Sequence, residues 1–120
     1  MKSAKEQVLD FYQSAGILNK NYCLDVLHED VKLEWYSSKG HLILELNDIL
    51  ALSKDLRLSY FDLRTDVYDI LHEDNKVMIR YAYYVRTFEN SDEELLLAHF
   101  FTSWDLKDNK FYRGVQMSQL

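Results

Sequence analysis

Four runs between residues 60 and 118 alternate in side-chain character at every second position, and short polar segments separate them. Alternation with a period of two is typical of antiparallel strands that present two different faces. In the second run, Val77, Ile79 and Tyr81 share one face, whereas Met78 and Arg80 share the other. The pattern therefore predicts a meander of long strands over the second half of the chain.

The first half reads as helical segments around one short strand. Ser3 and Glu6 have the spacing of a capping box, which predicts a helix that starts near Ala4. Further elements are expected at residues 22–27 (a short helix), 31–36 (a strand) and 47–58 (a helix capped by Asn47). The fold class predicted is α+β, a conical barrel in which a strongly curved antiparallel sheet wraps around three helices and encloses a cavity.

Composition narrows the possible partners. A chain of 120 residues fits one domain, residues 1–120, that can bury roughly two thirds of its unfolded surface. Fourteen basic and 20 acidic residues give a net charge of −6, which opposes binding to nucleic acid or to anionic membranes. The sequence shows neither the apolar segment of a signal peptide nor a run long enough to span a membrane, so a cytoplasmic location is expected. Cys23 is the sole cysteine and is expected to be a small buried hydrophobe.

The run over residues 96–106 is apolar on both faces, so the predicted sheet has a second face that needs a cover. The three helices occupy the first face and leave no segment for the second. A second copy of the chain is the simplest cover. We therefore expect a homodimer whose contact runs along an outward row of side chains: Ala82, Tyr84, His99, Phe101 and Ser103.

The order of the elements, together with four local segments, resembles the nuclear transport factor 2-like superfamily over the whole chain. The segments are VLDFYQSAG (8–16), LDVLHEDVKLEW (24–35), NDILAL (47–52) and FFTSWDLKDNKFYRGVQM (100–117). Among the members, the chain is most similar to the polyketide-cyclase-like (SnoaL-like) and ketosteroid-isomerase-like branch. The resemblance implies a conical α+β fold that holds a small apolar ligand.

The resemblance can be carried over position by position. Ketosteroid isomerases use a first-helix Tyr for an oxyanion, an Asp late in the first strand as base, and a protonated Asp on a late strand as a second donor. Tyr12 matches the first role. The base position falls on Trp35, and the neighbouring acid Glu34 has the wrong parity for the cavity, while the second donor falls near Thr102. Isomerisation by that set of groups is therefore not expected.

Relatives with dehydratase or epoxide-hydrolase chemistry use inward His, Asp and Arg groups. Asp69 shares the parity of the cavity face near the end of its strand and is a weak catalytic candidate, as is Glu34 if its parity is reversed. Arg113 shares parity with Phe111 and could bind an anion within the cone, whereas His99 has outward parity.

Leu-His-Glu-Asp occurs at residues 27–30 and again at 71–74. Neither copy has the second His that a helical zinc motif requires, so both are interpreted as polar turns. Neither a metal site nor a cofactor is predicted.

The function predicted is binding of a small, mostly apolar ligand in an aromatic-lined cavity. An isomerase, cyclase or dehydratase that uses a cavity acid is the first alternative, and a dimeric scaffold whose cone is filled by its own side chains is the second. An open cavity with an inward carboxylate or His would favour the enzyme, and an open cavity without one would favour binding. The predicted ligand-binding residues are Tyr12, Trp35, Tyr81, Tyr83, Phe100, Thr102, Trp104 and Arg113.

Overall fold

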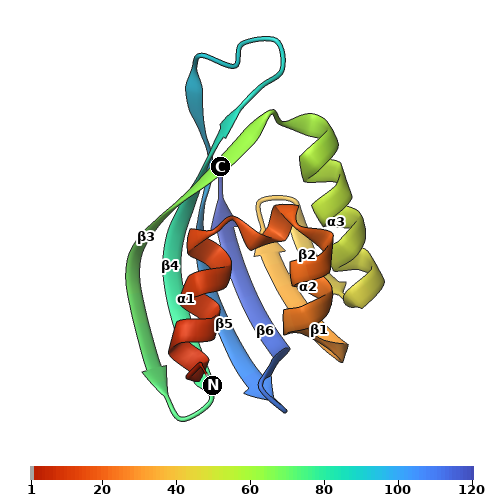
Figure 1. The fold of residues 1–120 in the computed structure, drawn as a ribbon, viewed down its shortest axis with the longest axis vertical. Helices are drawn as coiled ribbons and strands as arrows, with labels where there is room; N and C mark the ends of the chain where they lie inside the picture. The colour runs from red at the N-terminus through yellow and green to blue at the C-terminus, as the bar shows by residue number, and fades with distance from the viewer. Residues whose placement is uncertain (1) are drawn as a thin grey trace.

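The computed structural model describes residues 2–120 and confirms the predicted α+β fold: helices lie against a curled sheet that does not close on itself. The sheet has six strands in the order β2-β1-β6-β5-β4-β3 (Figure 1). The helices are α1 (Ala4–Gln13), the short 3-10 helix η1 (Gly16–Leu18), α2 (Lys20–Val26) and α3 (Leu46–Ser59). The strands are β1 (Leu27–Ser37), β2 (Gly40–Leu44), β3 (Asp62–Glu73), β4 (Lys76–Arg86), β5 (Glu94–Lys107) and β6 (Lys110–Gln119).

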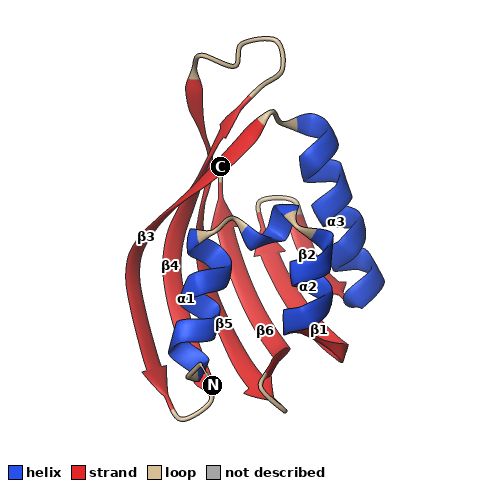
Figure 2. Cartoon of the chain, viewed as in Figure 1, coloured by secondary structure: helices blue, strands red, loops and turns tan. Residues whose placement is uncertain are grey.

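The sheet joins the two halves of the chain through one parallel contact. β1 pairs in parallel with β6, and every other neighbouring pair is antiparallel. The helices lie on one face of the sheet (Figure 2), with α1 against β3 and β4 and with α2 and α3 nearer β1. The core lies between these layers, where helical side chains meet the inward faces of the long strands: Val8, Phe11, Cys23, Ile49, Ile79, Tyr81 and Phe111.

The first helix begins as predicted, and the third does not. Ser3 Oγ accepts from the Glu6 backbone N–H at 3.1 Å, and Glu6 Oε1 accepts from the Ser3 N–H at 3.3 Å, which completes the capping box. The cap of α3 is Glu45 rather than Asn47. Asp48 Oδ2 accepts from the Glu45 N–H at 2.9 Å, so an acidic pair three residues apart starts this helix two residues before the expected cap.

A β-bulge reverses the parity of β3 beyond Val67. Val67 is opposite Tyr81, but Asp69 is opposite Arg80, so Tyr68 is an extra residue and the side chains that follow it point to the other face. The prediction that Asp69 shares the cavity face is therefore wrong. Asp69 lies on the outer face, where its Oδ2 is 2.8 Å from Nη2 of Arg80. Leu71, beyond the same bulge, is 71% exposed.

β5 and β6 each contain a bulge as well. In β5 the register shifts opposite Tyr83 and Tyr84, and Leu97 faces the cavity. In β6, Phe111 is opposite Leu106 and Arg113 is opposite Asp105, which leaves Tyr112 as the extra residue. Arg113 therefore lies on the outer face, and the interpretation of it as an inward, anion-binding residue is wrong.

Cys23 is fully buried, as predicted, with its Sγ 3.4 Å from the carbonyl oxygen of Gly16. Among residues 2–120, none of the helices combines the length and the apolar character that a membrane span requires. Leu27–Asp30, expected as a turn, instead opens β1.

Candidate functional site

An apolar cavity of about 240 Å³ lies between the helices and the concave face of the sheet. It exceeds the engineered apolar cavity of about 150 Å³ that holds benzene. Its walls come from α1, η1, α3 and the strands β1, β4, β5 and β6. The aromatic side chains on these walls are Phe11, Tyr12, Trp35, Tyr60, Tyr81, Tyr83, Phe100 and Trp104.

Cross-strand pairing builds the aromatic wall on the sheet. Tyr81 of β4 and Phe100 of β5 are direct partners, and their rings stack with centroids 5.1 Å apart and planes 9° apart. Tyr83 contacts the same Phe100 ring at 5.0 Å. From the helix layer, Tyr12 meets Tyr81 at 4.5 Å. Such pairs bury large apolar areas and fix the ring orientations, so the wall is rigid.

Both tryptophans satisfy their indole N–H groups within the chain. Trp104 Nε1 donates to Tyr12 Oη at 2.9 Å, and Trp35 Nε1 donates to Ser118 Oγ at 2.8 Å. Each bond joins elements that are distant in sequence, and each leaves the apolar part of the indole facing the cavity. Trp35 lies on the cavity wall.

A buried polar network lies beside the wall. The Tyr81 hydroxyl is 3.0 Å from Thr102 Oγ1, and both hydroxyls lie 3.2 Å from Gln116 Oε1. Thr102 has no exposed surface and is not among the residues that line the cavity, so it supports the wall rather than facing the space inside it.

Some of the predicted site residues line the cavity and the others do not. Six line the cavity: Tyr12, Trp35, Tyr81, Tyr83, Phe100 and Trp104. Thr102 lies behind the wall, and Arg113 and Asp69 lie on the outer face. Glu34 lies between the inward residues Leu33 and Trp35 and does not line the cavity, in agreement with its predicted parity.

Sequence reasoning missed two polar residues of the cavity, Gln116 and Ser118. Val115 and Met117 share the sequence parity of Phe111, but the bulge at Tyr112 turns both of them outward. The residue that could have indicated the inward face of this strand is Gly114, because a glycine within a strand often marks a close approach of other atoms. A Cβ at this position would lie 2.7 Å from both Leu33 Cδ1 and Trp104 Cζ3, so Gly114, and with it Gln116, must share the inward face.

Neutral side chains line the cavity over the described residues. Among residues 2–120, no Asp, Glu, His, Lys, Arg or Cys side chain lines it. Burial raises the pKa of Tyr12, and raises the pKa values of Tyr81 and Tyr83 well above the ordinary value of 10.0. These phenols stay protonated near neutral pH, so the site offers neutral hydrogen-bonding groups and no base.

We expect these tyrosines to make the protein unfold in alkali. Their pKa values are higher in the folded than in the unfolded chain, so their contribution to stability is fully present below pH 10.0 and is lost as the pH rises above it. A titration of tyrosinate absorbance, followed together with circular dichroism, should show exposed phenols ionising first and the buried ones only as the fold is lost. If all nine tyrosines ionised in one phase with the dichroism unchanged, the three would not be buried as described.

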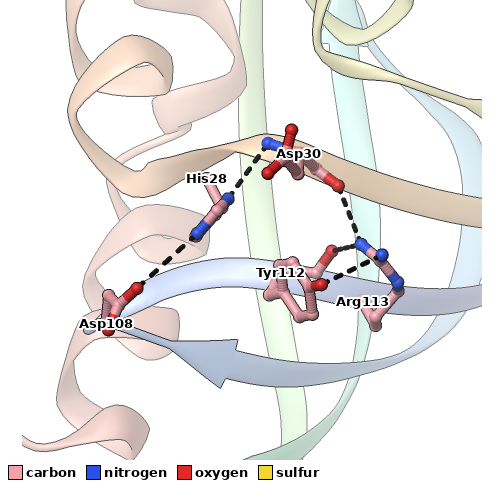
Figure 3. A network of polar contacts seen from close by, with 5 residues as sticks. All are labelled: His28, Asp30, Asp108, Tyr112 and Arg113. Carbon is pink, nitrogen blue, oxygen red and sulfur yellow. Dashed lines mark hydrogen bonds and ion pairs between the residues drawn. The ribbon is translucent and has the colours of Figure 1, made fainter.

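A second polar cluster lies away from the cavity, where the start of β1 meets the β5–β6 turn (Figure 3). His28 Nδ1 accepts from the Asp30 N–H at 3.0 Å, and His28 Nε2 is 3.8 Å from Asp108 Oδ2. Arg113 donates to the Asp30 carbonyl at 2.7 Å and to Tyr112 Oη at 3.2 Å. The cluster joins β1 to β6 where their register shifts. No group of His, Cys, Asp and Glu suited to a metal ion occurs within residues 2–120.

Comparison of the sequence with protein-family models found no match, and comparison with curated proteins found none either. Comparison of structures did find matches. IdmH from Streptomyces antibioticus, a proposed polyketide cyclase, has a TM-score of 0.79 at 10% identity, over 98% of this chain and 92% of IdmH. A proposed SnoaL-like polyketide cyclase from Jannaschia has a TM-score of 0.73 at 11% identity, over 96% and 84% of the two chains.

A nuclear transport factor 2-like protein of unknown function from Burkholderia pseudomallei has a TM-score of 0.70 at 12% identity, over 97% of this chain and 90% of that protein. Structures this similar at such low identity establish the fold. The chain therefore has the nuclear transport factor 2-like fold that its sequence resembles, in the form also found in SnoaL-like proteins.

Proposed function

We propose that this protein binds a small, uncharged, mostly apolar molecule in its aromatic cavity. The observation that carries the proposal is an open cavity of about 240 Å³ in which, within residues 2–120, no ionisable side chain other than tyrosine lines the wall. Burying a charged ligand there would leave the charge unpaired, which is strongly unfavourable. The volume suits a ligand of about two fused six-membered rings, larger than benzene.

A cyclase or isomerase is the second candidate, because two proteins of this fold are proposed polyketide cyclases. The enzyme would have to work without a cavity base, since Asp69 and Glu34 do not line the cavity. It would hold a reactive ligand in a folded shape and donate hydrogen bonds from neutral groups. Binding without turnover requires neither a reactive ligand nor catalytic hydrogen bonds, and it is the function we favour. A scaffold whose cone is filled by its own side chains would have no open cavity, so the cavity of about 240 Å³ does not support that alternative.

Filling the cavity should abolish binding without loss of the fold. Ala98 is buried and lines the cavity, so Ala98→Leu adds three carbon atoms to the space that a ligand needs. We expect tetralin, an uncharged molecule with two fused six-membered rings, to bind the wild type in a calorimetric titration and to bind Ala98→Leu at least tenfold more weakly. Ala51→Leu is the matched control, because Ala51 is exposed on α3 and does not line the cavity. Equal binding by all three proteins would contradict the proposal.

We also propose that a second copy of the chain covers the outer sheet face. Phe101, which is 50% exposed, lies between Arg80 of β4 and Met117 of β6 on that face. The neighbouring charges are paired within the chain, as in Arg80 with Asp69 and Arg64 with Glu94, so the surface that a second copy would meet is close to neutral. Ala82 is already fully buried within the chain, so its larger neighbours would supply the contact.

A further inference from the structure

We infer that Gln116 provides a hydrogen-bond donor inside the cavity and that the ligand is therefore one that carries a carbonyl oxygen. The inference rests on the proposed binding function and names the ligand class. Gln116 lies on β6, opposite Thr102 of β5 and beside Trp35 of β1. It lines the cavity, is 6% exposed, and is the only amide side chain there within residues 2–120.

One end of the Gln116 amide is held by the buried network. Its Oε1 lies 3.2 Å from the Tyr81 hydroxyl and 3.2 Å from Thr102 Oγ1, and both hydroxyls can donate to it. These two contacts hold the Oε1 end of the amide against the buried network. The NH₂ end is therefore directed away from Tyr81 and Thr102.

The NH₂ end of the amide is unpaired within the part of the chain that the structure describes. Among residues 2–120, no hydrogen bond is made by Gln116 Nε2. The one fully enclosed side-chain nitrogen or oxygen without a partner in that range is Thr65 Oγ1, so Gln116 Nε2 keeps accessible surface. Because the side chain points inward and lines the cavity, the open space beside Nε2 is the cavity itself.

An amide N–H that faces an apolar space without an acceptor is unfavourable, and an incoming acceptor removes that penalty. The acceptor should be uncharged, because no Lys, Arg or His side chain of residues 2–120 lines the cavity to balance an anion. A ketone, quinone or amide carbonyl on an apolar ring system meets both conditions. Thr102, which does not line the cavity, is a positioning residue that keeps the Gln116 amide turned in this direction.

The test compares 1-tetralone with tetralin, two bicyclic probes that differ by a carbonyl in place of a methylene. The measured quantity is the ratio of the tetralin dissociation constant to the 1-tetralone dissociation constant, because this ratio removes differences in cavity shape. We expect Gln116→Leu to lower the ratio about tenfold, the effect of losing one hydrogen bond, mainly by weakening 1-tetralone. Thr102→Val should lower the ratio less, since it only loosens the amide. Gln116→Met, which keeps the length of the side chain, replaces Gln116→Leu if that variant does not fold.

A second readout needs no variant. In the wild-type protein, 1-tetralone should shift the side-chain N–H resonances of Gln116 further downfield than tetralin does. Equal weakening of both probes by Gln116→Leu, or equal shifts with both, would mean that Gln116 only shapes the wall, and would overturn the inference while binding stands. If neither probe bound the wild type, the proposed function itself would fail together with the inference.

Discussion

Replacing Gly114 by valine should destabilise the protein more than any other single change considered. A Cβ at this position would lie 2.7 Å from Leu33 Cδ1 and 2.7 Å from Trp104 Cζ3, closer than real Cβ contacts. Trp104 cannot move freely because its Nε1 donates to the buried hydroxyl of Tyr12. Overpacking of this kind costs about 3 kcal/mol, a large share of a typical stability of about 5–15 kcal/mol. Urea unfolding followed by tryptophan emission should show the loss.

Gly114→Ala is the graded control, since it adds the Cβ without the two methyl groups and should lose less stability than Gly114→Val. Leu33→Ala in the Gly114→Val background should recover part of the loss, because it removes one of the two close contacts. An unchanged urea midpoint in Gly114→Val would mean that Trp104 and Leu33 do not pack against β6 as described.

Phe101→Glu should convert a dimer into monomers. It places a carboxylate at the centre of the outer face, beside an Arg80 that is already paired with Asp69, so a second copy would have to bury an additional charge. Sedimentation at roughly tens of micromolar, a range that an interface of standard size readily reaches, should detect the change. Phe88→Glu is a matched control, because Phe88 is similarly exposed at 58% but lies in the loop between β4 and β5.

The dimer would be contradicted if the wild-type chain sedimented as a monomer at this concentration. Dissociation of Phe88→Glu to the same extent as Phe101→Glu would also contradict it, because the contact would then not be centred on the outer face.

The parity of β4 could be predicted from the sequence, whereas the parity of the later parts of β3 and β6 could not. Tyr81 and Tyr83 are inward as expected because β4 itself contains no extra residue. β3 and β6 each contain one, at Tyr68 and Tyr112, and a single extra residue turns every later side chain to the other face. A tyrosine at a bulge looks like any strand tyrosine, so alternation alone could not reveal either shift.

These undetected bulges also explain which residues of the cavity were predicted and which were missed. The aromatic walls were found because Trp35, Phe100 and Trp104 lie in stretches of constant parity. Gln116 was missed because it follows a bulge and because an amide between Val115 and Met117 looks like an outward residue. The start of α3 was misplaced for a local reason: Asn47 is the stronger capping residue, but Asp48 accepts from the Glu45 N–H.

The most direct test of the central claim locates the ligand rather than measuring its affinity. Nuclear Overhauser effects between tetralin and methyl-labelled wild-type protein report which side chains lie within a few ångströms of the probe. We expect contacts to methyl groups of Leu33, Ile49 and Leu97, which line the cavity from three different elements. Contacts confined to Met78 and Met117, the exposed methionines of the outer face, would show that tetralin binds the open sheet surface and would contradict a ligand site inside the cone.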